Sequence, residues 1–296
     1  MDIHGFLKTH QLPSTYADTA QKWFIPLCER LVKHQDGAAN SIKAPLVVGI
    51  NGCQGSGKST LTDFVSAYLT SIYAKKVVCL SIDDFYLDKS QRNALSIKVH
   101  PLLATRGVPG THNMPLALDT FKQLKGSGQV ALPRFNKAID DPFPVNQWPV
   151  VTAPPDIIIL EGWCVGVTPQ NAADIKQPIN SLEENQDPLG IWRSFVNTEL
   201  SNDYQSLFDQ IDYRVMLKAP SFECVYRWRL EQEHKLAVAT KGASTGVMSD
   251  EQVAQFIQNY QRLTEHALKT LPTKCDTVYS LDETRSPLEL YLNIAG

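Results

Sequence analysis

The sequence predicts an α/β fold in which helices flank one parallel β-sheet. Apolar runs of strand length alternate with stretches where apolar residues recur at helical spacing. A glycine-rich turn also joins the first predicted strand directly to a helix, the order expected of units in a parallel sheet. Five strands, all of parallel type, are expected at residues 46–50, 76–82, 157–160, 213–217 and 277–281.

A length of 296 residues allows one large α/β domain or two small ones, and we expect residues 1–296 to form a single domain. Residues 1–44 are expected to be a helical extension before the sheet. Residues 16–34 are expected to form a helix within it because Trp23, Leu27 and Leu31 are four residues apart, with Pro26 as the point where the helix starts or kinks.

The first strand leads into a glycine-rich loop with the spacing G-x-x-x-x-G-K-[ST], which is the phosphate-binding loop or P-loop. Its glycines allow a sharp turn that presents backbone N–H groups to phosphate oxygens, and the next helix directs its positive end at the same anion. Lys58 is expected to reach the β- and γ-phosphates, and Ser59 to ligate Mg²⁺. The residues expected to contact a nucleoside triphosphate are Gly52, Cys53, Gln54, Gly55, Ser56, Gly57, Lys58, Ser59 and Thr60.

Acidic residues stand at the ends of two predicted strands. Asp83 and Asp84 follow residues 76–82, and Glu161 follows residues 157–160. The carboxyl ends of parallel strands line the edge where ligands bind, so these acids are expected beside the triphosphate. One aspartate could accept a proton from an attacking hydroxyl or hold Mg²⁺ through water, and Glu161 could hold or position Mg²⁺. The alternatives are a capping aspartate and a structural carboxylate.

Residues 86–150 are expected to form an acceptor-binding insertion. Two loops rich in proline and glycine, residues 105–113 and 132–137, carry cations and amides on either side of a predicted helix at 115–125. Long ordered loops are often binding loops, and a cationic lining suits an anionic acceptor. Solvated surface charges explain the same composition equally well.

Residues 222–248 are expected to form a lid region. Ser221 can cap a helix over residues 222–235 that carries Arg227 and Arg229. These arginines could clamp phosphate, but acidic residues four positions away could equally hold them in helix-surface salt bridges. A stretch rich in Gly, Ser and Thr follows, as a mobile lid would, and a capping box at 249–252 opens the next helix.

The composition argues against several partners. A net charge of −3 gives no reason to expect nucleic acid or an anionic membrane, and no apolar run reaches the ~20 residues that span a bilayer. Six scattered cysteines and no signal-peptide pattern favour a cytoplasmic protein with reduced thiols. Cys53, inside the glycine-rich loop, is a candidate reactive thiol. The oligomeric state stays open.

Three classes of nucleotide protein fit a P-loop: a small-molecule kinase, a GTPase switch, and an ATP-binding protein without turnover. The guanine signature Asn/Thr-Lys-x-Asp fails at the last position of residues 136–139, and residues 273–276 carry it before a strand rather than after one. A kinase needs a base, an acid for Mg²⁺, cations and a lid. The chain offers a candidate for each part, in Asp83, Glu161, Lys58 with Arg227 and Arg229, and residues 237–248.

Several motifs together resemble those of one family. They are residues 52–60, 81–87, 106–112, 133–137, 161–163 and 226–230. They resemble the motifs of plant-type D-glycerate 3-kinases and their bacterial and fungal kinase-like relatives, within the phosphoribulokinase, uridine kinase and pantothenate kinase group. The resemblance runs from the P-loop to residues 248–250 and leaves mainly the N-terminal helix outside.

The resemblance implies a P-loop kinase fold, a three-layer sandwich with strand order 2-3-1-4-5, that uses ATP and Mg²⁺. It implies that Asp83 rather than Asp84 is the general base, and that Ser59, Asp83 and Glu161 serve Mg²⁺. Arg227 and Arg229 would belong to the lid and the nucleotide site. Asn113 departs from the family, in which Asp is usual.

The resemblance also implies a small, hydroxylated, anionic acceptor, with D-glycerate phosphorylated on its 3-hydroxyl as the first choice. Its carboxylate needs a cation, which Arg106, Arg134 or Lys137 could supply. A nucleoside, a pantothenate-like compound or a sugar phosphate would use the same ATP machinery. The residues expected to bind the acceptor are Asp84, Arg106, His112, Arg134 and Lys137.

Overall fold

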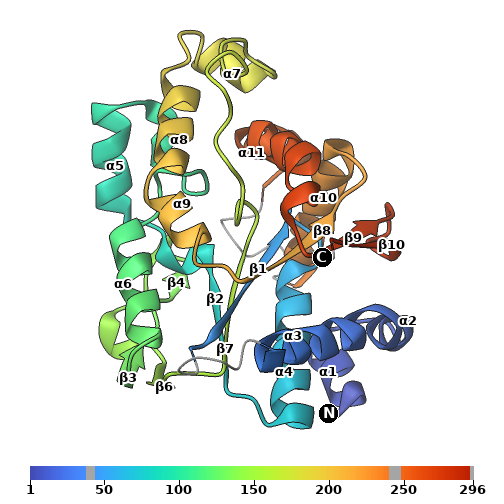
Figure 1. Cartoon of the computed structure of the whole chain (residues 1–296). Helices are drawn as coiled ribbons and strands as arrows, with labels where there is room; N and C mark the ends of the chain where they lie inside the picture. Colours follow the sequence, from blue (N-terminus) through green and yellow to red (C-terminus); the bar gives the residue numbers. More distant parts are fainter. Residues whose placement is uncertain (38–43, 240–247, 294–296) are drawn as a thin grey trace.

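The computed structural model describes residues 1–37, 44–239 and 248–293, and places a six-stranded sheet at the centre (Figure 1). The strands run in the order β10-β9-β8-β1-β7-β2. Their bounds are β1 Leu46–Gly52, β2 Val77–Ser81, β7 Ile157–Gly162, β8 Tyr213–Lys218, β9 Thr277–Leu281 and β10 Pro287–Leu292.

The first five of these strands in chain order are parallel, and their order across the sheet is 2-3-1-4-5. This confirms the predicted α/β fold of P-loop kinase type. β10 was not predicted: it pairs antiparallel with β9 and adds a sixth strand at the edge. Only Pro287 of its residues is buried, so β10 lacks the apolar pattern that reveals a core strand.

Helices cover both faces of the sheet. In Figure 1, α3 and α4 lie on one side of β1, β2 and β7, and α6, α8 and α9 lie on the other. The helices are α1 Ile3–Thr9, α2 Thr15–Thr19, α3 Ile25–Gly37, α4 Lys58–Tyr73, α5 Lys89–Lys98, α6 Met114–Leu124, α7 Ser181–Gln186, α8 Ile191–Ser201, α9 Asp203–Phe208, α10 Phe222–Ala239 and α11 Asp250–Thr270. Two small antiparallel sheets belong to the region between β2 and β7: β3 Gly128–Ala131 with β6 Val150–Ala153, and β4 Phe135–Asn136 with β5 Asp141–Pro142.

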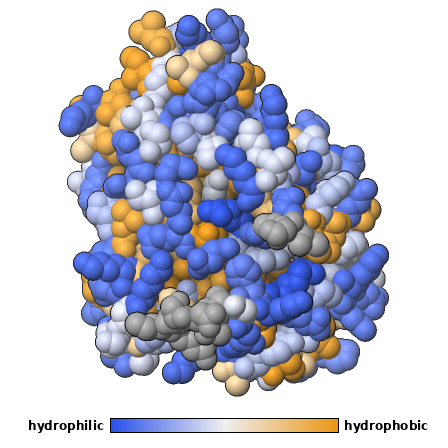
Figure 2. Space-filling model, in the orientation of Figure 1, coloured by the Kyte–Doolittle hydropathy of each residue, from blue (hydrophilic) through white to orange (hydrophobic). Residues whose placement is uncertain are grey.

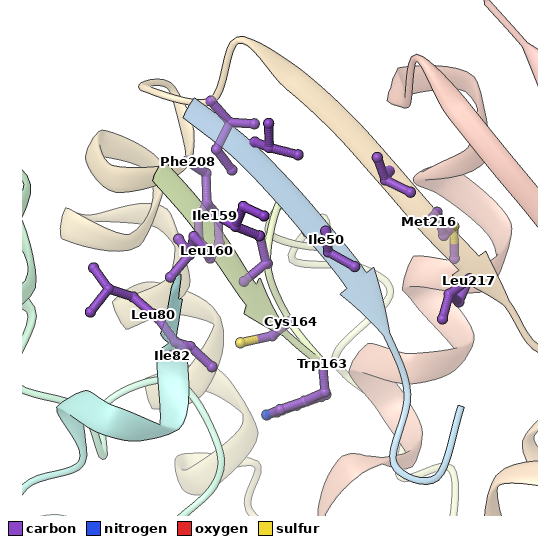
Figure 3. Close-up of a cluster of buried hydrophobic side chains, with 14 of the residues drawn as sticks. Ile50, Leu80, Ile82, Ile159, Leu160, Trp163, Cys164, Phe208, Met216 and Leu217 are labelled. Atoms are coloured by element: carbon purple, nitrogen blue, oxygen red, sulfur yellow. The ribbon is translucent and has the colours of Figure 1, made fainter. Parts of the chain in front are cut away.

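The central strands are apolar because both of their faces are covered. Every residue of β1 and β7 is buried, as expected for the middle of a parallel sheet. Figure 3 shows Ile50 of β1 and Ile159 and Leu160 of β7 in a cluster of buried apolar side chains, with Trp163 just beyond the end of β7. The parallel register sets Glu161 level with Ile50 on one side and Ser81 on the other, so three strand ends meet at one edge.

The N-terminal helix continues through Pro26. A π-helical turn, Ala20–Phe24, joins α2 to α3 and ends two residues before Pro26, whose ring would otherwise crowd the preceding turn. Leu27 and Leu31 are fully buried, as their spacing predicted, and Trp23 packs at the edge of the core. The same buried cluster contains these helices and the sheet.

Candidate active site

The P-loop has the backbone that a phosphate cradle requires. Gly55 and Gly57 have φ values of +77° and +88°, a region that favours glycine, and α4 begins at Lys58. At Gly55 a Cβ atom would stand 2.6 Å from Cβ of Trp228, so no side chain fits there. The loop and the helix N-terminus together offer N–H groups to an anion.

Glu161 links the P-loop to the end of β7. The Ser59 hydroxyl donates to Glu161 Oε1 at 3.1 Å, and Lys58 Nζ lies 3.8 Å from Oε2. Glu161 is buried, and its Oε2 accepts no hydrogen bond from any described residue. A free carboxylate oxygen beside a hydroxyl suits Mg²⁺, which takes one or two protein oxygens and fills its other positions with phosphate oxygens and water. The residues therefore fit a magnesium ion.

Asp83 lies on a 3₁₀-helix, Ile82–Phe85, that follows β2. Its Oδ2 accepts from Lys137 Nζ at 2.6 Å, and its Oδ1 accepts from the Tyr86 hydroxyl at 2.9 Å. Burial opposes ionisation, but the charges of Lys137 and Lys58 and the two hydrogen bonds outweigh it and lower the pKa of Asp83 to about 2. The carboxylate is therefore ionised at neutral pH.

Asp84 has a different environment from its neighbour. Its Oδ2 accepts from the Ser81 backbone N–H at 2.9 Å and closes a capping box at the start of the 3₁₀-helix. Arg134 Nη1 donates to the same oxygen at 3.2 Å. Burial is the main cause of a raised pKa for Asp84. Asp84 therefore acts as a capping residue in this structure, and Arg134 is hydrogen-bonded to it.

Arg106 and Lys137 bring two cations to the Asp83 region. Arg106 pairs with Asp140 and lies over the ring of Phe135, with its guanidinium 5.5 Å from the ring centroid. Asp140 also accepts from the buried Arg92 at 2.6 Å. The sequence analysis missed Asp140 and Arg92. Both lie outside the family motifs, and only the packing of the loops brings them together.

His112 lies against Tyr86, with the ring centroids 4.5 Å apart and nearly parallel. Its Nδ1 is 2.6 Å from the Tyr204 hydroxyl. Burial lowers the pKa of His112 to about 4, although the charge of Asp83 acts in the opposite direction. The imidazole is therefore neutral at physiological pH. Tyr204, on α9, is a third residue that no motif indicated.

A hollow of about 500 Å³ opens on the α8–α9 side of His112. Its lining includes His112 itself, Met114, Glu199 and Asp203, but no P-loop residue and not Asp83. Two carboxylates would repel an anionic acceptor, so this hollow does not suit one.

Asn113, the departure from the family pattern, caps α6 by accepting from the Leu116 N–H at 3.1 Å, which an aspartate would do equally well.

The two arginines of α10 have unlike partners. Arg227 Nη1 lies 3.0 Å from Glu283, in the turn between β9 and β10, rather than bonding an acid on its own helix. Arg229 forms the expected pair with Glu233, at 2.6 Å. Glu233 is buried and also accepts from the Met248 backbone N–H at 2.9 Å. The rest of the predicted lid, residues 240–247, lies outside the described residues.

Arg285 is a further residue at the P-loop that sequence reasoning missed. Its Nε donates to the Gly55 carbonyl at 2.8 Å, and its guanidinium lies 5.4 Å from the centroid of the Trp228 ring. Its Nη2 donates to Glu231 of α10. An arginine in a short polar turn belongs to no recognisable motif. The role of Arg285 is therefore visible only because the β9–β10 turn packs against the P-loop.

The cysteines are buried thiols. All six lie within the described residues and are free, and only Cys79 is partly exposed. Burial raises the pKa of Cys53 to about 12, with Lys58 acting weakly in the other direction. At neutral pH this residue is a protonated thiol, which is a poor nucleophile. The environment does not support the expectation of a reactive Cys53.

Among the described residues, no helix is long and apolar enough to cross a bilayer. Figure 2 shows a largely hydrophilic face with hydrophobic residues interspersed. Within the same residues, no three His, Cys, Asp or Glu side chains gather as a metal site.

Comparisons with known proteins agree with this geometry. The model of the phosphoribulokinase/uridine kinase family matches residues 47–178. An uncharacterized kinase, mug58, of Schizosaccharomyces pombe is 33% identical over 287 residues, which cover 90% of this chain and 98% of that protein. The chloroplastic D-glycerate 3-kinase of Arabidopsis thaliana is 32% identical over 82% of this chain, but the match spans 54% of the plant protein.

A solved structure has a similar fold. The D-glycerate 3-kinase of Cryptococcus neoformans superposes with a TM-score of 0.72 and 26% identity, covering 91% of this chain and 98% of that one. P-loop, strand-end acids and whole-chain similarity therefore point to the same conclusion. This chain belongs to the phosphoribulokinase/uridine kinase family and is an ATP-dependent kinase of small molecules.

Proposed function

We propose that the protein transfers the γ-phosphoryl group of ATP to the 3-hydroxyl of D-glycerate. The observation that carries the proposal is the position of Asp83: its carboxylate contacts Lys137 and lies within electrostatic range of Lys58 on the P-loop. A candidate base, an acceptor cation and a phosphate cation thus lie within one site. The names of the plant and fungal relatives support D-glycerate as the acceptor.

The nucleotide end would act by positioning and charge. The P-loop N–H groups would bind the β-phosphate region, and Lys58 would balance the negative charge on the transferred group. Ser59 and Glu161 would hold Mg²⁺, with Asp83 reaching it through water. When bound, the ion would neutralise negative charge on the phosphate oxygens. Phosphoryl transfer has a loose transition state, so positioning and charge supply most of the catalysis.

At the acceptor end, Asp83 would accept the proton of the attacking hydroxyl. A carboxylate with a pKa of about 2 is a weak base, so proton transfer is expected late, after the new P–O bond has made the hydroxyl acidic. Lys137 and Arg106 would bind the acceptor carboxylate, and to do so they must share or exchange their present partners, Asp83 and Asp140. The part of the hollow that Glu199 and Asp203 line would stay outside the acceptor site.

A coupled ADP-release assay over a panel of acceptors tests the proposal. The panel contains D-glycerate, L-glycerate, 3-hydroxypropionate, pantothenate and uridine. We expect D-glycerate to give the highest kcat/KM, and Asp83→Asn to abolish most of that turnover without loss of ATP binding. A higher kcat/KM for pantothenate or uridine would replace the proposed acceptor. ATP binding with no acceptor-stimulated turnover would favour the non-catalytic alternative.

A further inference from the structure

Tyr204 makes two hydrogen bonds in a position closed to solvent. It is fully buried on α9, and its oxygen accepts from the Gly110 backbone N–H at 2.9 Å. The same oxygen lies 2.6 Å from His112 Nδ1. A phenol has one hydrogen to donate, and among the described residues only the His112 nitrogen is placed to receive it.

This pairing decides which nitrogen of His112 carries the proton. The imidazole is neutral, so it has one N–H. If Nδ1 carried it, Tyr204 would accept two hydrogen bonds and leave its own buried O–H unpaired. If Tyr204 donates to Nδ1, the phenol hydroxyl and Nδ1 are both paired, and the proton of His112 must lie on Nε2.

The Nε2–H of His112 is then a donor without an acceptor. His112 is buried, and its Nε2 has no hydrogen-bond partner among the described residues. Leaving a buried donor unpaired is unfavourable, so a ligand oxygen at that position would be bound favourably. The ring stacks on Tyr86, whose hydroxyl donates to Asp83, so the unpaired donor stands one ring away from the candidate base.

We propose that Tyr204 is a positioning residue that holds His112 in the Nε2–H tautomer, and that this N–H donates to an uncharged oxygen of the acceptor. The cations Lys137 and Arg106 suit the anionic group, whereas a neutral donor suits a hydroxyl. The acceptor class is thus a hydroxy acid with an oxygen besides the transferred hydroxyl and the carboxylate. In D-glycerate this is the 2-hydroxyl, so the substrate part of the inference rests on the proposed function.

The tautomer is tested without any substrate. Selective ¹⁵N labelling of the seven histidines, with His112→Gln to assign the signal, lets two-bond ¹H–¹⁵N spectra distinguish the two ring nitrogens. We expect His112 in the wild type to show a protonated Nε2 and an unprotonated Nδ1, and Tyr204→Phe to lose this single tautomer. A protonated Nδ1 in the wild type would overturn the positioning role, whatever the acceptor proves to be.

The substrate contact is tested by kinetics with paired variants. Glutamine places an amide N–H near the position of Nε2 and asparagine near that of Nδ1, so His112→Gln is expected to retain more activity than His112→Asn. Tyr204→Phe is expected to raise the KM for D-glycerate about tenfold, the effect of one hydrogen bond, with a smaller change in kcat. In the His112→Gln background the same change is expected to have almost no effect, because glutamine has no tautomer.

Two controls separate this role from a structural one. Tyr213→Phe removes another buried tyrosine hydroxyl, bonded to Thr277 at 2.7 Å in the sheet, and should leave the KM for D-glycerate unchanged. With 3-hydroxypropionate, which lacks the 2-hydroxyl, the KM effect of Tyr204→Phe should largely disappear. Equal effects of Tyr204→Phe in both His112 backgrounds, or with both acceptors, would contradict the proposal. No turnover of D-glycerate by the wild type would reject the substrate part and leave the spectra to decide the tautomer.

Discussion

The nucleotide half and the acceptor half of the site are built differently. At the P-loop, the backbone forms most of the site, through positive φ angles at Gly55 and Gly57 and a helix N-terminus. The Glu161 side chain adds an oxygen that accepts no hydrogen bond from any described residue. In the acceptor half, side chains form it, and their charges are already paired: Lys137 with Asp83, Arg106 with Asp140, and Arg134 with Asp84.

This difference predicts how each half responds to its ligand. A backbone cradle keeps its shape when empty, so a phosphate meets donors already in place. Paired cations must give up part of an existing interaction to bind an acceptor, so an anion has to compete with Asp83 and Asp140. Changes at the P-loop should therefore alter nucleotide binding and folding, and changes among the ion pairs should alter the acceptor KM and the pH response.

The largest expected effect separates the two neighbouring aspartates. Asp83→Asn should lower kcat by about 10²–10⁴-fold, because it removes the candidate base while keeping the side-chain size. Asp84→Asn should leave kcat within about twofold and lower the melting temperature, because Asp84 closes a capping box and pairs with Arg134. Steady-state kinetics and thermal unfolding of both variants check this, and a large kcat loss in Asp84→Asn would reverse their roles.

The next effect tests the rigid backbone of the nucleotide half. Gly55→Ala should destabilise the protein by about 2–4 kcal/mol and weaken ATP binding, because a Cβ would collide with Trp228 at a φ of +77°. Gly128→Ala is the matched control. It also has a positive φ, of +108°, but nothing lies within 4 Å of its Cβ position, so only the backbone cost of about 1–2 kcal/mol is expected. Urea unfolding and ATP titration measure both; equal losses would argue against the Trp228 contact.

In the acceptor half, Lys137→Gln should raise the KM for the acceptor about tenfold with little change in the KM for ATP. It should also change the acid response. The pKa of Asp83 is about 2 in the folded protein against an ordinary value of 3.8, so ionised Asp83 stabilises the fold above about pH 4, and this contribution is lost as pH falls toward 2. Without Lys137 the folded-state pKa rises and the contribution becomes smaller.

Acid-unfolding curves of the wild type and Lys137→Gln measure this part of the prediction. As the pH falls, the variant should begin to lose stability at a higher pH than the wild type does. Lys125→Gln, which removes a lysine bonded to Gln210 on the surface, is the control and should match the wild type. Identical curves for the wild type and Lys137→Gln would show that the ion pair does not set the ionisation of Asp83.

The smallest expected effect concerns the support of the P-loop. Arg285→Gln should raise the KM for ATP about three- to tenfold and leave the acceptor KM unchanged, because it removes the hydrogen bond to the Gly55 carbonyl. Lys235→Gln is the matched control, since Lys235 pairs with the same Glu231 but does not reach the P-loop. Equal changes in the two variants would show that Arg285 acts only through Glu231.

Local sequence patterns were sufficient for much of the fold. A strand, a glycine-rich turn and a helix depend on interactions within a few residues, so the P-loop and the Ser249–Gln252 capping box were predictable and are present. The same holds for the strand-end positions of Asp83 and Glu161, because parallel strands must end at one edge. The strand order followed from the resemblance to known kinases rather than from any local pattern.

The fold class, the phosphate loop and the presence of acids at the strand ends could thus be read from the residues alone. Which side chains meet depends on the packed structure: Arg227 pairs with Glu283, Asp140 pairs with Arg106, and Tyr204 forms a hydrogen bond with His112. These partners are separated by 34 to 92 residues along the chain. Their contacts depend on how helices and loops pack, and no short spacing rule encodes that packing.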